Sequence, residues 1–433
     1  MPPAGEPRRS LGLAATTSLV IGNMVGSGVF LLPASLAPYG AYSLWGWIVS
    51  AAGALLLARV FSRLSRRTPL AGGPYSYPRE VFGDFAGFLL AWMYWISIAA
   101  SVAAIAIAFA SYLATFVPLL GTRPIAGAAA ALAAGWLLTG VSILGVRAAG
   151  RLQLITVILK ISPLLVFAVW GIFYFNPHML ASGGTVQSVP VTIDSCAALT
   201  MWAFLGLECA TIPADHVKDP ERTIPRATLY GTAIAAVFYI LCTTAVMGII
   251  PAASLVHSNA PFADAAKLLW GGWAGNLIAL AAIISCFGAL NGWILMSGQF
   301  AQAAARDNLF PRLFAKELDR GTPALGLVLS SILATLLILM DYRRGLVATF
   351  NIIILIATFF TLVPYMLCSM AELLLGRGDK ARGRNIALSF LAFAFSLWFA
   401  AGTGRESLYW GTLLMLAGLP LYAWQKWNQQ APG

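Results

Sequence analysis

The stretch Leu19–Pro33 reads LVIGNMVGSGVFLLP and lies within the first long apolar segment of the chain. A helix that crosses lipid must satisfy its backbone hydrogen bonds internally, because unpaired groups are costly in hydrocarbon. The cluster Gly26–Gly28 instead favours an opened helix, which frees amide N–H groups that can bind a carboxylate. We therefore predict a discontinuous helix that lines a cavity, as in secondary transporters. The alternative is a small-residue packing face that runs from Gly22 to Gly26.

The composition places the chain among polytopic membrane proteins. Of its 433 residues, 59% are hydrophobic and only 10% are charged, too few to cover a soluble protein of this size. The net charge of +11 does not indicate nucleic-acid binding, because the basic residues separate apolar spans and are not interleaved with aromatics. We expect twelve spans, at about 13–36, 41–62, 85–116, 123–144, 152–175, 194–214, 227–250, 274–303, 323–342, 346–375, 384–402 and 407–425.

The distribution of positive charges predicts the topology. With the N-terminus inside, the loops on that side carry 21 Lys and Arg residues, against five on the opposite side. The first apolar run is not followed by a small-residue cleavage site, so we expect it to be a retained helix. The prediction is a multi-pass membrane protein with both termini in the cytoplasm.

Motifs for metal, cofactor or nucleophilic chemistry are not found in the sequence. The five cysteines fall within apolar spans without C-x-x-C spacing, and the three histidines form no ligand cluster. We therefore expect no metal, no cofactor and no enzymatic activity. A membrane-embedded enzyme or a channel remains as an alternative from another class.

Two ionisable residues are expected deep in the membrane. Lys160 lies in the fifth span, three residues before Pro163, and Glu208 lies in the sixth, close to Gly206. Intramembrane charges are costly and are functional by default, although a lysine pinned by carbonyls at a helix break is the structural alternative. Gly206 predicts a second discontinuous helix, five spans after the first, which points to a binding site between two halves of a transporter.

Three aromatic residues are also too deep in their spans to belong to an interfacial belt. They are Tyr94, Trp202 and Trp293, the last of which follows Asn291–Gly292 in mid-span. A desolvated aromatic face attracts an organic cation with about 2 kcal/mol. Any one of them alone is more often a core residue, but all three together with two broken helices favour a binding site.

Several motifs in the right order resemble a known family. They are GNMVGSGVF (22–30), GGPYSY (72–77), WAFLGLE (202–208), KDPERTIPR (218–226), GW (292–293), DNLFP (307–311) and TLVPY (361–365). The chain resembles the amino acid–polyamine–organocation (APC) transporters, and within them the basic amino acid/polyamine antiporters of the bacterial arginine/agmatine type. The resemblance implies an all-α membrane protein of the LeuT type, as one domain over 1–433. Inverted five-helix repeats would lie at about 13–175 and 194–375, helices 1 and 6 would be discontinuous, and two peripheral helices would lie at about 384–425.

The resemblance also implies roles for individual residues. Ser27 and Gly28 would bind the substrate carboxylate, and the carbonyl groups of Met24, Trp202 and Leu205 would take its α-ammonium group. Trp202 would cover the substrate and Trp293 would stack on its side chain. The gating residues would be Tyr94 on the outer path, with Tyr75, Glu208 and Tyr365 in inner gating and the response to pH.

Two departures from the arginine/agmatine pattern affect the prediction. Val102 aligns with an asparagine that holds the arginine side chain, so arginine specificity is not expected to carry over. Lys160 resembles a lysine that occupies the place of a sodium ion, and it would bridge Gly22–Val25 to the eighth span near Ser285. We therefore expect a sodium-independent exchanger of a cationic amino acid against a related amino acid or its decarboxylated amine. A homodimer is compatible with this prediction. The alternative is a proton-coupled or exchange transporter of neutral amino acids.

Overall fold

The protein is an almost entirely helical bundle. The computed structural model describes residues 11–26, 28–67, 73–144, 162–181, 188–211, 217–318, 323–376 and 382–430. Within these ranges no β-strand forms, and a single isolated bridge pairs Leu11 with Val217. Ser27 and Lys160, both predicted site residues, lie outside the described residues.

Nine helices of the described ranges are long and apolar enough to cross a membrane. They are α3 (Tyr42–Arg67), α5 (Asp84–Leu113), α7 (Pro124–Leu144), α10 (Val189–Met201, which continues to Thr211 as a span), α11 (Pro220–Met247), α14 (Gly272–Arg306), α15 (Ala324–Asp341), α16 (Leu346–Leu375) and α17 (Arg382–Gly402). A tenth span consists of α1 (Leu13–Met24) and α2 (Gly28–Leu36), which form a pair bent by 40°. The predicted all-α membrane fold is therefore confirmed.

The shorter helices connect the spans or cover their ends. They are α4 (Ser76–Phe82), α6 (Leu119–Thr122), α9 (Pro177–Ala181), α12 (Ala252–Leu255), α13 (Pro261–Trp270), α18 (Arg405–Leu416) and α19 (Gly418–Gln430). The apolar helix Ser162–Tyr174 is the described part of the predicted fifth span.

The last predicted span, 407–425, falls on two successive helices. The chain is divided there into α18 and α19, of 12 and 13 residues, neither of which has the length of a span. Gly418 lies at the break, where an added Cβ would be 2.6 Å from Cδ1 of Trp92, so a larger residue would prevent this close packing. The indole N–H of Trp92 also donates to the carbonyl of Leu414, at 2.9 Å. The count of twelve spans and the two inverted repeats stay predictions.

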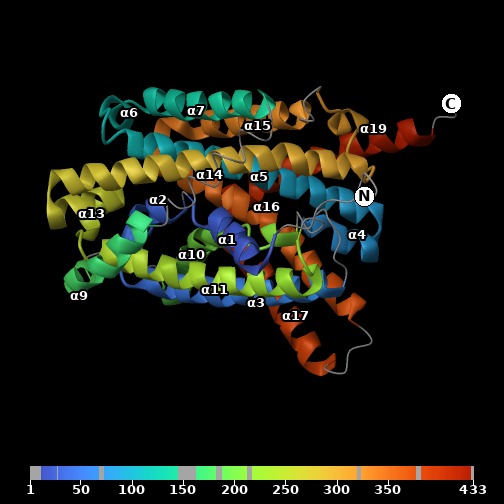
Figure 1. Cartoon of the computed structure of the whole chain (residues 1–433), viewed down its shortest axis with the longest axis horizontal. Helices are drawn as coiled ribbons and strands as arrows, with labels where there is room; N and C mark the ends of the chain where they lie inside the picture. Colours follow the sequence, from blue (N-terminus) through green and yellow to red (C-terminus); the bar gives the residue numbers. More distant parts are fainter. Residues whose placement is uncertain are drawn as a thin grey trace, which may run out of the picture.

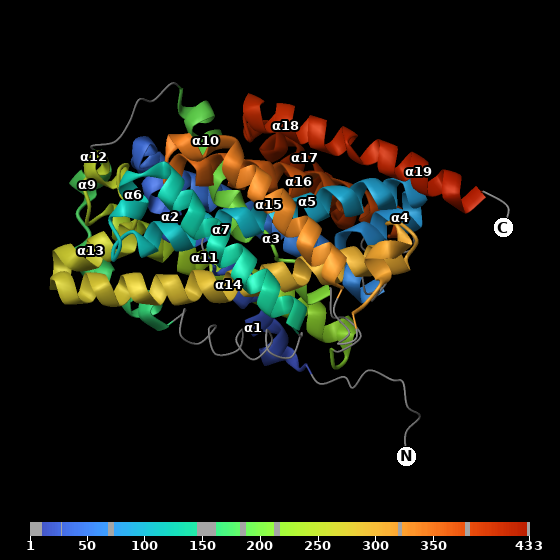
Figure 2. The same cartoon turned by 90° about the horizontal axis from the view of Figure 1, so that it is seen from above.

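The long helices form two groups with the interrupted segments between them. Helices α3 and α11 lie side by side in one group, while α5, α7, α14 and α15 pack together in the other. The bent pair α1–α2 and the end of α10 occupy the middle of the bundle (Figure 1). Seen from above, α18 and α19 run along the outside of the bundle (Figure 2).

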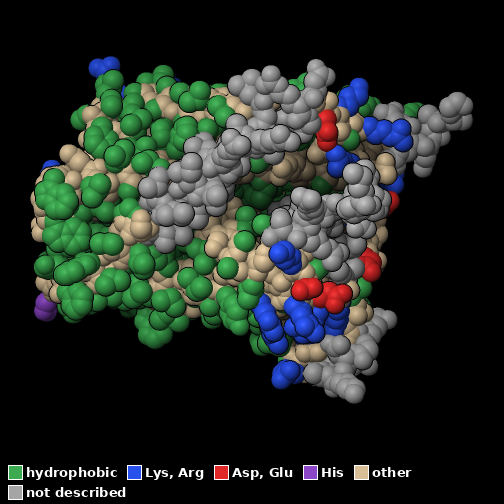
Figure 3. Space-filling view, viewed as in Figure 1, with side chains coloured by type: hydrophobic (Ala, Val, Ile, Leu, Met, Phe, Trp, Pro, Cys, Tyr) green, Lys and Arg blue, Asp and Glu red, His purple; other side chains and the backbone are tan. Residues whose placement is uncertain are grey.

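The surface divides into an apolar body and one charged end. Hydrophobic side chains cover most of the visible face, whereas Lys, Arg, Asp and Glu gather at the end where α4 and α19 lie (Figures 1 and 3). Large apolar side chains such as Phe173 and Trp273 are 78% and 70% exposed, respectively. An apolar surface of this extent fits a lipid environment. The end of the bundle where α4 and α19 lie is called the charged end.

Candidate functional site

The first helix is interrupted where the glycines predicted it. Helix α1 ends at Met24, Val25 leaves the helical region with ψ of 84°, and α2 begins at Gly28. The N–H of Gly26 turns back to donate to the carbonyl of Met24, at 2.9 Å. A Cβ at Gly26 would be 3.3 Å from Cβ of Ala289, and one at Gly28 would be 2.9 Å from Trp202. The glycines therefore allow both α14 and the sixth span to approach the break closely.

The sixth span is interrupted at the same level of the bundle. Helix α10 ends at Met201, a single turn follows at Trp202–Phe204, and Leu205 is extended. Gly206 then has φ of +95°, a backbone conformation that glycine adopts without the penalty of a side chain. The prediction of a break at Gly206 is confirmed, and the interruption directs the backbone of this span toward α1.

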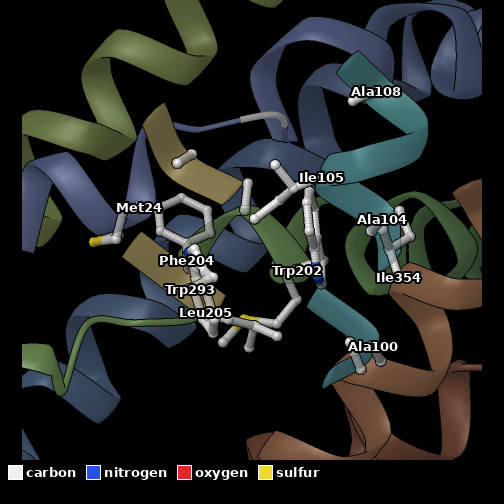
Figure 4. Packing of buried hydrophobic residues seen from close by; sticks show 14 of the residues in the cluster. Met24, Ala100, Ala104, Ile105, Ala108, Trp202, Phe204, Leu205, Trp293 and Ile354 are labelled. Carbon is white, nitrogen blue, oxygen red and sulfur yellow. The ribbon is translucent and has the colours of Figure 1, made fainter. Parts of the chain in front are cut away.

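An enclosed cavity lies between the two interruptions. Its lining is contributed by α1, α2, α5, α14 and the sixth span, and consists of Asn23, Met24, Gly26, Gly28, Ser101, Ile105, Trp202, Ala203, Leu205 and Trp293. In Figure 4, Ile105, Trp202, Leu205 and Trp293 lie close together, whereas the side chain of Met24 points away from them. The cavity volume is about 20 Å³, room for about one water molecule. The cavity is therefore too small for an amino acid in this conformation.

Two polar atoms at this cavity are buried without a hydrogen-bond partner among the described residues. They are the hydroxyl of Ser101 and the indole Nε1 of Trp202. Buried polar atoms are paired in the great majority of cases, so both atoms are candidates for contact with a polar ligand. The cavity wall is otherwise apolar, as is usual for a small-molecule site in which a few polar groups determine orientation.

Glu208 follows Leu205 of the cavity wall by three residues and forms the centre of a polar cluster. The side chain is fully buried, and the hydroxyl groups of Tyr94 and Tyr365 each donate to one of its carboxylate oxygens. Glu208 forms no ion pair with any residue in the described part of the chain. A buried carboxylate is costly unless a positive charge or a proton compensates it. This position is therefore suited to a cationic ligand or to proton binding.

Tyr75 forms a second polar contact, at the charged end of the bundle. Its hydroxyl donates to Oδ2 of Asp307 at 2.8 Å, and Arg79 lies 3.7 Å from the same oxygen. Burial raises the pKa of Tyr75, and the negative charge of Asp307 raises it further. The phenol therefore stays neutral at physiological pH and keeps its proton for this hydrogen bond.

Phe300 of α14 connects the two tyrosine clusters. Its ring lies 5.5 Å from the ring of Tyr75 and 5.0 Å from that of Tyr94, between centroids. Nothing in the sequence distinguishes Phe300 from the other 23 phenylalanines, and its role as a connector depends on tertiary packing. Phe300 therefore packs against both Tyr75 and Tyr94, which is the partner of Glu208.

The structure brings most of the predicted site residues together, with some differences. Met24, Gly28, Trp202, Leu205 and Trp293 share the cavity, as predicted. Tyr94 binds Glu208 together with Tyr365, although the sequence analysis assigned them to different gates. Tyr75 lies apart from the cavity. Ser285 is fully buried in α14, and its hydroxyl has no hydrogen-bond partner among the described residues.

On α5 the structure brings a polar residue, Ser101, to the cavity beside the departure noted at Val102. Val102, which aligns with the asparagine of the arginine exchangers, lines a separate cavity toward α7 and α15. Ser101 faces the central cavity in its place. Successive residues of an α-helix point about 100° apart, so a shift of one position changes the face. Without the packing of α5, the sequence offered no signal that favours Ser101.

Two interrupted helices around an enclosed cavity, within a bundle of apolar spans, define a secondary transporter. The chain belongs to the amino acid permease family, whose model matches residues 11–416. It is 33% identical to the cadaverine/lysine antiporter of Escherichia coli K12, over 98% of this chain and 96% of that protein. It is 30% identical to the putrescine transporter PotE of Haemophilus influenzae, over 95% of this chain and 96% of the relative. The resemblance to basic amino acid/polyamine antiporters is thus confirmed.

Proposed function

We propose that this protein exchanges a cationic amino acid for a related amino acid or its decarboxylated amine, independently of sodium. The observation that carries the proposal is Glu208, a fully buried carboxylate beside the cavity that forms no ion pair among the described residues. A cationic substrate compensates this charge, whereas a neutral side chain does not. The two relatives, a cadaverine/lysine antiporter and a putrescine transporter, agree with this chemistry.

Each part of the substrate has a proposed partner in the cavity. The carboxylate would bind at the start of α2, at Ser27 and Gly28, and the α-ammonium at the carbonyl groups of Met24, Trp202 and Leu205. Trp202 would cover the substrate. The cationic side chain would lie against the face of Trp293, with the unpaired hydroxyl of Ser101 nearby. A diamine would keep the ammonium contacts, and water would occupy the position that binds the carboxylate.

The remaining predicted residues would act as gates or would replace a bound sodium ion. Tyr94 and Tyr365 would open and close the path at Glu208, and Tyr75 would close the charged end through Asp307. Lys160 would replace a sodium ion and contact Ser285, whose hydroxyl is buried. We place the protein in the bacterial inner membrane with both termini in the cytoplasm, in agreement with its charge distribution. A homodimer is compatible with the exposed apolar faces and is part of the proposal.

Exchange can be tested with purified protein in liposomes. Labelled lysine is added outside vesicles that contain cadaverine, putrescine, lysine, leucine or no substrate. We expect rapid uptake only with a cationic substrate inside, unchanged when choline replaces sodium. At neutral pH, uptake into empty vesicles as fast as uptake into vesicles loaded with a cationic substrate would contradict exchange. Equal uptake against leucine would favour the neutral amino acid alternative.

The role of Glu208 requires a separate comparison. Glu208→Gln removes the charge and keeps the shape, so we expect loss of cadaverine binding by about tenfold or more. Glu406→Gln, on an exposed carboxylate of α18, is the matched control and should bind as wild type does. Both proteins should unfold at similar temperatures, which separates loss of binding from loss of structure. Normal cadaverine binding by Glu208→Gln would refute the proposed compensation.

A further inference from the structure

A second, larger pocket lies at the charged end of the bundle. It opens between the turn that follows α14 and the terminal helix α19, and its volume is about 430 Å³, against about 20 Å³ for the central cavity. The turn contributes Asn308, Pro311, Arg312, Leu313 and Lys316, and α19 contributes two further residues. The pocket is separate from the transport site, and it has a size suited to a headgroup or a small ligand.

The pocket presents two uncompensated cations. Arg312 and Lys316 are exposed, and neither forms an ion pair within the described part of the chain. The neighbouring acid Glu317 is already bound to Arg306, at 2.7 Å.

Asp84 and Asp307, two other acids at this end, also have cationic partners. Asp84 pairs with Arg79 at 3.0 Å and with Lys426 at 3.5 Å, and Asp307 accepts from Tyr75 with Arg79 nearby. The positive charge that remains therefore faces the pocket, where it favours an anion such as a phosphate.

Gln425 of α19 supplies a third polar group. Its Nε2 donates to the carbonyl oxygens of Asn308 and Phe310, at 2.6 and 3.2 Å, which fixes the orientation of the amide. Its Oε1 is buried without a hydrogen-bond partner among the described residues, and the residue as a whole is only 8% exposed. An unsatisfied buried acceptor costs about 1–3 kcal/mol, so a ligand hydroxyl or ammonium that donates to it is favoured.

The surroundings of the pocket indicate a membrane interface. Trp424 lines the pocket and is 50% exposed, and Trp427, one helical turn further, is 75% exposed. Leu313 on the facing turn is 51% exposed. Exposed tryptophans beside basic residues are typical of the level of lipid headgroups.

We propose that this pocket binds the headgroup of an anionic phospholipid. Arg312 and Lys316 hold the phosphate, and a headgroup hydroxyl donates to Oε1 of Gln425. The bound lipid connects α19 to the turn that contains Asp307, the acceptor of the Tyr75 hydroxyl. Phosphatidylglycerol has both required groups, a singly charged phosphate and a free hydroxyl.

The proposal can be tested by lipid binding to the purified full chain in neutral detergent. Native mass spectrometry measures retained lipid for phosphatidylglycerol, phosphatidylcholine and phosphatidylmethanol, and thermal unfolding is recorded in parallel. We expect tight binding of phosphatidylglycerol alone, with a raised unfolding temperature. Phosphatidylmethanol carries the same charge without the hydroxyl, and we expect it to bind several-fold more weakly. Equal retention of phosphatidylcholine would overturn the proposal, and equal retention of phosphatidylmethanol would overturn the role of Gln425.

Variants test whether the binding is at this pocket. The double variant Arg312→Gln/Lys316→Gln should weaken phosphatidylglycerol binding about ten- to thirtyfold. Lys316→Gln alone provides a milder change if the double variant does not fold. The matched control, Arg222→Gln/Arg226→Gln, removes two exposed cations elsewhere and should bind as wild type does. Equal losses in both double variants would overturn the specific site. Glycerol 3-phosphate that competes at the affinity of the lipid would show a site for a soluble phosphate instead.

Discussion

Replacing Gly28 by alanine tests the close contact between the two interrupted spans. A Cβ at this position would be 2.9 Å from Cζ3 and 3.2 Å from Cε3 of Trp202, and 3.4 Å from Cβ of Ala203. Carbon atoms in optimal contact are about 3.5–4.0 Å apart, so the indole ring would have to retreat by about 0.5–1 Å. The adjacent cavity of about 20 Å³ leaves little space for this movement without loss of the room that a substrate needs.

The size of the effect follows from the cost of overpacking. Extra methyl groups in a tight core cost about 1–3 kcal/mol, which corresponds to a factor of about 5–150 in an equilibrium constant. We therefore expect Gly28→Ala to weaken cadaverine and lysine binding by a factor in this range, and Gly28→Leu to abolish it. Calorimetric titration of the purified protein measures the affinity, and counterflow in liposomes measures the exchange rate.

Two comparisons isolate the contact itself. Gly135→Ala, in α7, is the matched control because an added Cβ there meets nothing within 4 Å, and its binding should be unchanged. In a Trp202→Leu background the further penalty of Gly28→Ala should shrink, since the ring that causes the clash is gone. The reasoning is refuted if Gly28→Ala folds, binds and transports as wild type does.

Three further changes address other parts of the proposed mechanism. Trp293→Leu should weaken the binding of cationic substrates by about tenfold or more, because about 2 kcal/mol of cation–π attraction is lost. Neutral substrates should lose less affinity, and titration of both ligands on this variant measures the difference. Tyr75→Phe should change the exchange rate but not the midpoint of its pH profile between pH 5 and 9. Burial raises the pKa of Tyr75 above its ordinary value of about 10. The phenol proton and its hydrogen bond to Asp307 are therefore present from pH 5 to 9 and are lost only at higher pH. A shifted midpoint of the pH profile would contradict this reasoning. Lys160→Met should abolish transport, and transport by the wild type should not change when choline replaces sodium. Normal transport by Lys160→Met from pH 5 to 8 would show that the lysine is purely structural.

The membrane helices could be predicted from the sequence because their signal is local. A span needs about 20 apolar residues, and the positions of Gly26 and Gly206 were sufficient to place both interruptions. The division between α18 and α19 was missed, although Gly418 and Pro420 lie at it. Pro420 cannot donate a backbone hydrogen bond to the carbonyl of Leu416, where α18 ends. The close packing of Gly418 against Trp92 is a tertiary contact that no local pattern contains.

The site was predictable in its residue types but not in its pairings. Depth in a span singled out Glu208 and Tyr94, since both are unusual at mid-membrane. That Tyr94 and Tyr365 share one carboxylate depends on the relative positions of α5, α16 and the sixth span, which are set by packing. The same holds for Ser101, because the rotation of α5 about its axis decides whether position 101 or 102 faces the cavity.

The environment of Glu208 also gives a physical reason for exchange rather than free export. An ionised carboxylate that receives hydrogen bonds but no cation from the described residues carries a desolvation penalty of several kcal/mol, which a cationic substrate would offset. If the carrier changes sides without a substrate, it must leave that charge uncompensated or take up a proton. Return of the empty carrier is therefore slow at neutral pH, so that each outward movement waits for a second cation, and it accelerates as acid supplies the proton. Efflux of labelled cadaverine without a counter-substrate should accordingly rise as the pH falls, and Glu208→Gln, which is neutral at every pH, should remove this dependence.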